Sequence, residues 1–164
     1  MSKDILTETL QELTFLHGID RRHLERIASI AQICNFAAED VVFREGQAAE
    51  SIYLVVSGKL GLELTPASIN RKQLVDVGPG EMLGWSSLVE HPTFAATAVV
   101  VEPARLVRID GRQLRAICDE DPQFGYEFMR STMRALAKRL LATWMQLSHL
   151  HVSQYMPVSA PLDE

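Results

Sequence analysis

The stretch Gly78-Pro79-Gly80-Glu81-Met82-Leu83-Gly84-Trp85-Ser86-Ser87-Leu88-Val89 determines how the rest of this chain is interpreted. A second stretch, Phe94-Ala95-Ala96-Thr97, follows shortly after it. Glycines this closely spaced mark tight turns. The amides of a short helix after Gly84 can donate hydrogen bonds to an anion, and Ser86 and Ser87 can add hydroxyl groups. The first stretch is therefore expected to form a tight loop that leads into a short helix with donor groups at its start.

Short β-rich runs separated by turn residues surround this loop between about residues 32 and 110. The runs are Val41–Phe43, Ile52–Val56, Leu60–Leu64, Gln73–Val77, Ala96–Val101 and Arg105–Ile109. Strands this short, at this spacing, are typical of a barrel or jelly roll. No long helices lie between them to connect parallel strands, which disfavours a parallel α/β sheet. We therefore predict a mainly β, α+β fold with an antiparallel β-roll or jelly-roll barrel over residues 32–110.

Helical patterns flank the predicted strands on both sides. Residues 1–31 predict two short helices, the first with an apolar face and the second with Asp20 as its N-cap and apolar positions that continue to Ala31. Asp110 is placed to cap a helix that ends near Cys118, and Asp121 to cap a helix that begins at Pro122. We divide the single structural domain into residues 1–31, 32–110, 111–156 and a tail at 157–164.

The last helix is predicted to be unusually long. Neither proline nor glycine interrupts the chain from Tyr126 to Met156, and about 30 helical residues extend roughly 45 Å. Apolar residues recur at alternating spacings of three and four, as at the a and d positions of a heptad. The predicted seam comprises Met133, Leu136, Leu140, Thr143, Leu147 and Leu150, widened by Leu141 and Trp144. This seam predicts a homodimer through the helix; the alternative is a helix that bends back onto its own barrel.

Composition limits the classes of function. The net charge of -5 argues against general affinity for nucleic acid. The two cysteines, Cys34 and Cys118, form no disulfide framework and are expected to be small buried hydrophobes. No signal-peptide pattern or membrane-spanning apolar run occurs, so a cytoplasmic location is the default expectation. No nucleophile-and-base pattern, phosphate loop or metal-ligand set is present, so we expect neither an enzyme nor a metal site.

Three glycine motifs follow one another along the chain: Val41-x-Phe43-x-x-Gly46, Tyr53-x-Val55-x-x-Gly58 and Gly78-x-Gly80-x-x-x-Gly84. In this order they resemble the sensor domain of the Crp/Fnr superfamily. The resemblance implies a cyclic-nucleotide-binding fold with a phosphate-binding cassette after the last of these motifs. It also implies that a glutamate following the cassette glycine holds the ribose, and that a later arginine pairs with the cyclic phosphate. The corresponding positions here are Trp85 and Phe94, followed by Ala95.

By this resemblance the candidate ligand-binding residues are Gly80, Glu81, Met82, Leu83, Gly84, Trp85, Ser86, Ser87, Phe94, Ala95, Ala96 and Thr97. A cyclic phosphate buried without a counter-charge costs at least several kcal/mol, which disfavours cyclic AMP and cyclic GMP. Three interpretations stay open: Trp85 and Phe94 face each other and fill the pocket, they line an apolar site, or they stack a planar ligand. Arg130, Arg134 and Lys138 form a cationic stripe with Arg139 beside it, and a further hypothesis is that one of these arginines reaches the pocket; the alternative is a solvated helix face.

Two classes of function follow from these patterns. The first is a small-molecule sensor in which a ligand in the cassette repositions the Asp121 helix. The second is a ligand-free module that dimerises and docks on another protein. Cyclic AMP or cyclic GMP binding is a further alternative, and no cofactor is assigned; some superfamily members bind haem through Cys or His. The family's helix-turn-helix has no counterpart before Glu164, so we expect a stand-alone module that binds neither DNA nor membrane.

Overall fold

Two long strands form the middle of one antiparallel sheet in the computed structural model, which describes residues 3–64, 73–89 and 93–155. These strands are β3 (Ser51–Leu64) and β6 (Thr97–Asp110), and they pair with each other along most of their length. The main path of the sheet runs β1-β6-β3-β4, while β2 pairs with β6 and β5 pairs with β3. The other strands are β1 (Ala31–Phe36), β2 (Val41–Phe43), β4 (Gln73–Val77) and β5 (Met82–Leu83).

The mainly β, antiparallel fold with flanking helices is confirmed, although the sheet of the described residues does not close into a barrel. The runs Ile52–Val56 and Leu60–Leu64, expected as separate strands, are one bent strand. The register with β6 shifts on both sides of Ser57, which marks β-bulges. Gly58 adopts φ +91°, and a Cβ there would lie 2.3 Å from the carbonyl oxygen of Pro103. Glycine therefore lets the two long strands bend together without a break.

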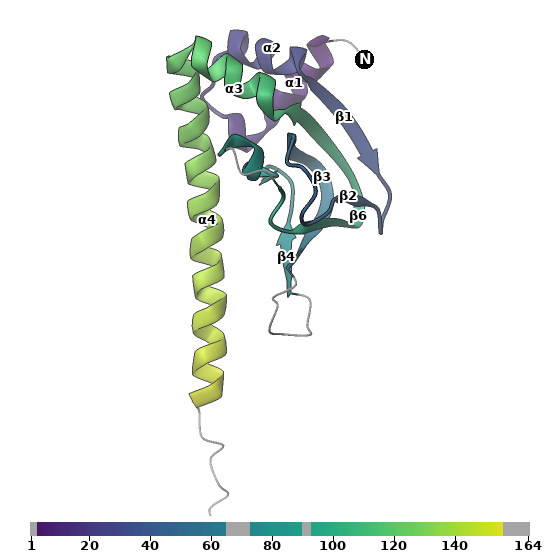
Figure 1. Ribbon diagram of the computed structural model, residues 1–164, viewed down its shortest axis with the longest axis vertical. Helices are drawn as coiled ribbons and strands as arrows, with labels where there is room; N and C mark the ends of the chain where they lie inside the picture. The colour runs from purple at the N-terminus through teal and green to yellow at the C-terminus, as the bar shows by residue number, and fades with distance from the viewer. Residues whose placement is uncertain (1–2, 65–72, 90–92, 156–164) are drawn as a thin grey trace, which may run out of the picture.

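Five helical segments cover one end of the sheet and one of its sides (Figure 1). They are α1 (Lys3–Glu12), η1 (Thr14–Leu16), α2 (Arg21–Ser29), α3 (Gly111–Glu120) and α4 (Pro122–Tyr155). The predicted capping by Asp110 is confirmed, because its Oδ1 accepts a hydrogen bond of 2.8 Å from the amide of Gln113. Asp121 caps α4 through the amide of Phe124 at 3.2 Å.

The amino-terminal prediction differs from the structure in two details. Asp20 occupies the N-cap position of α2, but its side chain makes no capping hydrogen bond; instead its Oδ2 lies 3.8 Å from Arg22 Nε. The apolar helical pattern extends to Ala31, yet α2 ends at Ser29 and Ala31 is the first residue of β1, paired with Ile109. Pairing with β6 overrides the local helical pattern there, because the sheet satisfies the backbone groups equally well.

The core has two parts that meet at β5. One cluster lies between the helices and the sheet and contains Phe124 and Phe128, both fully buried. The other lies within the bent sheet and contains Phe43 and Phe94. The neighbouring residues Met82 and Leu83 belong to the first and second cluster respectively, since successive side chains of a strand point to opposite faces. The predicted cassette therefore lies at the junction of the two clusters.

Helix α4 has 34 residues, a length of about 51 Å at 1.5 Å per residue. It packs on α3 and η1 near its start and continues past the sheet at its carboxyl-terminal end (Figure 1). Phe124 and Phe128 are fully buried, whereas Leu140 and Leu141 are at least half exposed. Among the described residues no helix combines the length and apolarity that crossing a membrane requires.

Candidate functional site: the cassette around Gly84

Gly84 sets the local backbone of the cassette. It adopts the left-handed conformation with φ 76°, and a Cβ there would lie 2.7 Å from the Ser51 carbonyl oxygen. The chain then forms a single 3-10 turn, η2 (Trp85–Leu88). The Ser87 hydroxyl donates to the Gly84 carbonyl at 3.1 Å, and the Ser87 carbonyl accepts a hydrogen bond from Arg115. The hydroxyl expected to face a ligand is thus used within the turn itself.

Phe94 lies opposite Gly84 and is only 4% exposed. Its backbone is fixed to the loop before β3, because its amide donates to Gln47 O and its carbonyl accepts from the Gly46 amide, both at 2.9 Å. The Phe94 ring stacks on the Phe43 ring with centroids 3.9 Å apart and planes 18° from parallel. The contact gains dispersion energy and removes apolar ring surface from water.

Trp85 does not share this stack. It is half-buried and packs against the helical core cluster, whereas Phe94 belongs to the cluster within the sheet. Among the described residues, the Phe94 ring pairs with the Phe43 ring, and no ring pair includes Trp85. The two residues that occupy the family's glutamate and arginine positions thus pack in different directions from the cassette.

The space left between these side chains has a volume of only about 40 Å³. A water molecule occupies about 30 Å³ of liquid, and pockets for small organic ligands measure about 300–1,000 Å³. Six of the predicted ligand-binding residues line this space: Gly84, Trp85, Ser86, Phe94, Ala95 and Ala96. The other six do not line it. Leu83 and Ser87 are buried, and the Thr97 hydroxyl accepts a hydrogen bond from the Glu45 amide at 3.0 Å. The last three line a separate groove: Gly80, Glu81 and Met82.

Arg139 of α4 also lines the small cassette cavity. Its Nη2 donates to the Met82 carbonyl at 2.9 Å and lies 3.9 Å from Glu81 Oε1. Burial lowers the pKa of the Arg139 guanidinium, while the charge of Glu81 acts in the opposite direction. Glu81 is itself held by the Gly78 amide at 2.8 Å. The sequence indicates several cations on this helix, and the packing of α4 shows that Arg139 is the one that lines the cassette cavity.

A model of the cyclic nucleotide-binding domain matches residues 33–121, which is more than half of the chain. The chain belongs to the cyclic nucleotide-binding domain family. That match runs from β1 to the start of α4 and includes the whole cassette.

Comparisons with individual proteins agree with this assignment of the domain. A CRP-like cAMP-activated global transcriptional regulator of Mycobacterium tuberculosis is 24% identical over 88% of this chain and 63% of its own length. A cyclic AMP receptor protein of Thermus thermophilus is 30% identical over 57% of this chain and 43% of its own length. The chain therefore spans less than two thirds of these relatives. The solved cyclic nucleotide-binding domain from Methylobacillus flagellatus superposes with a TM-score of 0.76, covering 96% of this chain and 86% of that one; at 13% identity this likeness concerns the fold.

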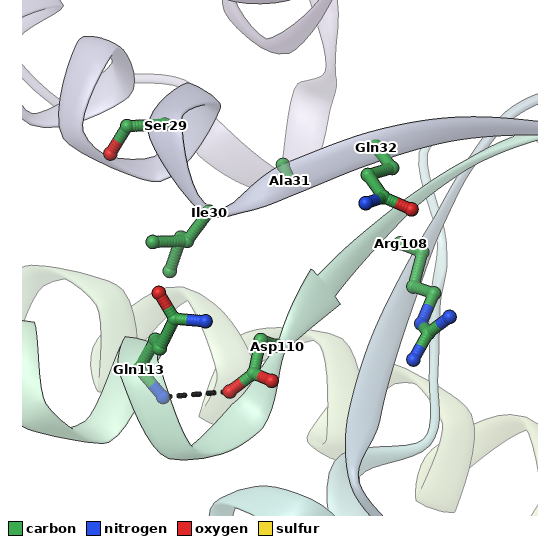
Figure 2. Close-up of a pocket in the computed structure, with 7 residues that line it drawn as sticks. All are labelled: Ser29, Ile30, Ala31, Gln32, Arg108, Asp110 and Gln113. Carbon is green, nitrogen blue, oxygen red and sulfur yellow. Dashed lines mark hydrogen bonds between the residues drawn. The ribbon is translucent and has the colours of Figure 1, made fainter.

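A second cavity of the domain, of about 230 Å³, lies between the end of α2 and the start of α3 (Figure 2). Asp110 and Arg108 supply its charged groups. Asp110 is engaged in capping α3 through the Gln113 amide, and Arg108 Nε donates to the Ser51 hydroxyl at 3.0 Å. Both charges are used to hold elements together, so this cavity is a weaker candidate than the cassette.

The predicted dimer seam lies on α4. Met133 is 72% exposed and Leu140 50% exposed, and Trp144 is also exposed. Leu136 and Thr143 are partly buried, and the Thr143 hydroxyl donates to the Arg139 carbonyl at 2.9 Å. The backbones of Leu147 and Leu150 are helical, but their side chains lie outside the described residues, as does the predicted tail 157–164. The exposed seam residues leave the predicted partner helix room to pack.

Both cysteine thiols of the domain are free and partly buried. Burial raises the pKa of the Cys118 thiol to about 11, so this sulfur stays protonated at neutral pH and is a poor nucleophile and metal ligand. Within residues 3–64, 73–89 and 93–155, no three His, Cys, Asp or Glu side chains are grouped so that they could hold a metal ion.

Proposed function

We propose that this chain is a regulatory module of the cyclic nucleotide-binding domain family whose cassette is filled by its own aromatic side chains. In this proposal cyclic AMP and cyclic GMP are not its ligands, and the module acts through dimerisation and contact with another protein. The observation that carries the proposal is the Phe94–Phe43 stack, which leaves about 40 Å³ beside Gly84. A space that holds about one water is far below the size of an organic ligand's pocket.

Opening the cassette requires Phe94 to leave its stack. Removing a buried phenylalanine from a core costs about 3–5 kcal/mol, and a cyclic phosphate placed there loses its hydration in addition. The family's position for a phosphate-binding arginine carries Phe94, which offers no charge in return. A bound cyclic nucleotide therefore has to recover both costs from other contacts.

A second candidate function, a sensor for a non-standard anionic or cyclic nucleotide ligand, is favoured by one observation. Arg139 lines the same small cavity from α4, where its Nη2 donates to the Met82 carbonyl at 2.9 Å and lies 3.9 Å from Glu81 Oε1. A ligand phosphate would be a stronger partner for a guanidinium than a carbonyl. Relatives whose names describe activation by cAMP or reception of cyclic AMP add support to this alternative.

The output of the proposed module runs through α4. Apolar side chains at positions 133 and 140 are exposed on a helix that continues past the sheet, and a second copy of the chain offers an equivalent surface for them. We propose a homodimer through this seam, with a regulatory and non-catalytic role. Two free thiols fit a reducing compartment such as the cytoplasm.

Restoring the family's residues tests the proposal. We compare the unmodified chain with a Trp85→Glu/Phe94→Arg variant in thermal unfolding with and without cyclic AMP, because a ligand that binds only the native state raises its stability. The unmodified chain is expected to show no shift, and the variant to gain one. A shift of the unmodified chain at micromolar cyclic AMP favours the second candidate and contradicts the first. Phe94→Arg alone controls for the separate effect of the restored charge.

A further inference from the structure

A groove separate from the cassette cavity runs between η1, the loop from Pro79 to Met82, and the first half of α4. Its volume is about 370 Å³, within the range of small-molecule sites. Its apolar floor includes Phe15 and Met82, which are 7% and 2% exposed. The hydroxyl-bearing residues Thr14 and Ser131 also line it. The groove thus combines an apolar floor with polar walls.

The charge of the groove is unusual for this acidic chain. Three cationic side chains line it from one side, Arg134, Lys138 and Arg139. Among the described lining residues the only carboxylate is that of Glu81, so the groove has a net charge of +2, counting His17 as neutral, while the whole chain carries -5. Glu81 is already engaged with the Gly78 amide at 2.8 Å.

The cations at the mouth of the groove have no acidic partner. Arg134 and Lys138 are exposed, and no ion pair joins either of them to another side chain within the described part of the chain. They are four residues apart, so they stand one above the other on the same face of α4. Arg139 lies beside them with its Nη2 on the Met82 carbonyl at 2.9 Å. Two cations without an ion pair in the described part of the chain, and a third that contacts both the Met82 carbonyl and the Glu81 carboxylate at 3.9 Å, form a cationic cradle for a dianion.

This face of α4 differs from the seam that we propose for dimerisation. Groove residues occupy positions 131, 135 and 138, whereas seam residues occupy positions 133, 136 and 140. An offset of two residues turns a helix by about 200°, so groove positions 131 and 138 lie on the opposite side of α4 from seam positions 133 and 140. Leu141, which widens the seam, follows Arg134 by seven residues and lies on nearly the same side as Arg134. A dimer formed through positions 133 and 140 leaves the groove accessible to a ligand.

From this geometry we infer that the groove binds a small phosphate monoester with an apolar body. The phosphate dianion pairs with Arg134 and Lys138, with Arg139 behind them, and the apolar portion lies on Phe15 and Met82. Charge-assisted hydrogen bonds to phosphate are the strong class of such contacts, and a second ionisation near neutral pH gives a phosphate monoester the matching double charge. This inference does not rest on the proposed function, because it concerns a different cavity.

The test is a calorimetric titration of the full chain with phenyl phosphate, and separately with inorganic phosphate, at constant ionic strength. We expect one saturable site for phenyl phosphate and weaker binding of inorganic phosphate, which lacks the apolar body. The variant Arg134→Gln/Lys138→Gln, whose substituted residues are both exposed, is expected to fold and to bind phenyl phosphate about tenfold or more weakly.

The matched control is Arg130→Gln, which removes a cation of the same helix that does not line the groove. The Cζ of Arg130 lies 5.6 Å from the centroid of the Tyr126 ring. Its affinity for phenyl phosphate is expected to match that of the unmodified chain. The inference is overturned by an absence of saturable heat with the unmodified chain, or by equal weakening in the control variant. Equal affinities for phenyl phosphate and inorganic phosphate overturn the assignment of the apolar floor. Circular dichroism of each variant confirms that all three chains are folded when they are compared.

Discussion

Phe94 lies flat on Phe43, with ring centroids 3.9 Å apart and ring planes 18° from parallel. In the family pattern the position of Phe94 belongs to the arginine that holds a cyclic phosphate. Here the residue at that position completes the core of the sheet, beside Val55, Leu60 and Leu106. The same side chain cannot contribute to this core and vacate the cassette for a ligand, so stability and ligand entry compete at Phe94.

Replacing Phe94 measures how much the stack contributes. Phe94→Ala is expected to lower the free energy of unfolding by about 3–5 kcal/mol, because a buried ring is lost and a cavity remains. Urea denaturation followed by circular dichroism gives this value. Tyr126→Ala, at a ring that is 67% exposed, is the aromatic control and is expected to change stability by less than about 1 kcal/mol. Equal effects of the two substitutions would show that Phe94 is not part of the packed core.

Gly58 is expected to tolerate substitution less well than Gly46. A Cβ there meets the carbonyl oxygen of Pro103 at 2.3 Å and the Cα of Ala104 at 2.5 Å, with φ at +91°. Gly58→Ala therefore combines a backbone clash, costing about 1–3 kcal/mol, with a left-handed conformation that costs about 1–2 kcal/mol. Gly46→Ala shares only the second cost, since φ is +79° and nothing lies within 4 Å. Urea midpoints of the two variants should differ accordingly, and similar midpoints would contradict the close approach at Gly58.

Features that depend on contacts between residues close in the sequence could be predicted from it, whereas features that depend on contacts between distant residues could not. Caps at Asp110 and Asp121 were predictable, because a capping carboxylate acts on amides only a few residues away. The joining of two β runs into one strand at Gly58 could not be predicted, because the backbone that closely approaches Gly58 belongs to Pro103, far along the chain. The placement of Ala31 in β1 instead of in α2 could not be predicted either, because it depends on pairing with the distant residue Ile109.

The candidate site shows the same division. The cassette and its two aromatic replacements are visible in the sequence as a spacing of glycines followed by Trp85 and Phe94. Phe94 stacks on Phe43, which lies far from it in the sequence on strand β2. No local sequence pattern predicts this contact. Arg139 was one of several cations on a helix, and only the packing of α4 distinguishes it by placing it at Met82.

Asp121 is expected to make the stability of the domain depend on acid pH. The Phe124 amide lowers the pKa of the Asp121 carboxyl below its ordinary value of 3.8, and the hydrogen bond from His23 Nε2 at 3.0 Å contributes in the same direction. A carboxyl with a lowered native pKa stabilises the fold above its unfolded pKa, and this contribution is lost as pH falls through the native value. Stability due to Asp121 should therefore be complete above about pH 4 and decline below it.

The measurement is the urea midpoint from pH 6 to pH 3 for the unmodified chain and for Asp121→Asn, which keeps a capping oxygen without the charge. The difference in stability between the two chains should shrink as the pH falls. Asp119→Asn, at an exposed neighbour, controls for the loss of one negative charge. A constant difference across the range would rule out the contribution of the Asp121 charge.

Leu140→Glu is expected to separate the proposed dimer into monomers. Leu140 is 50% exposed on α4, and in a two-fold dimer each substitution places two carboxylates into one apolar seam. Light scattering should give twice the monomer mass for the unmodified chain and the monomer mass for the variant. Ala142→Glu adds the same charge two residues further along, on another face of the helix, and should leave the dimer intact. A dimer that survives Leu140→Glu would exclude this seam.

The closed cassette is tested most directly by calorimetric titration of the unmodified chain with cyclic AMP. If Phe94 and Phe43 fill the space beside Gly84, no saturable heat of binding should be seen up to millimolar nucleotide. Saturable binding in the micromolar range, with one nucleotide for each chain, would contradict a cassette filled by its own rings.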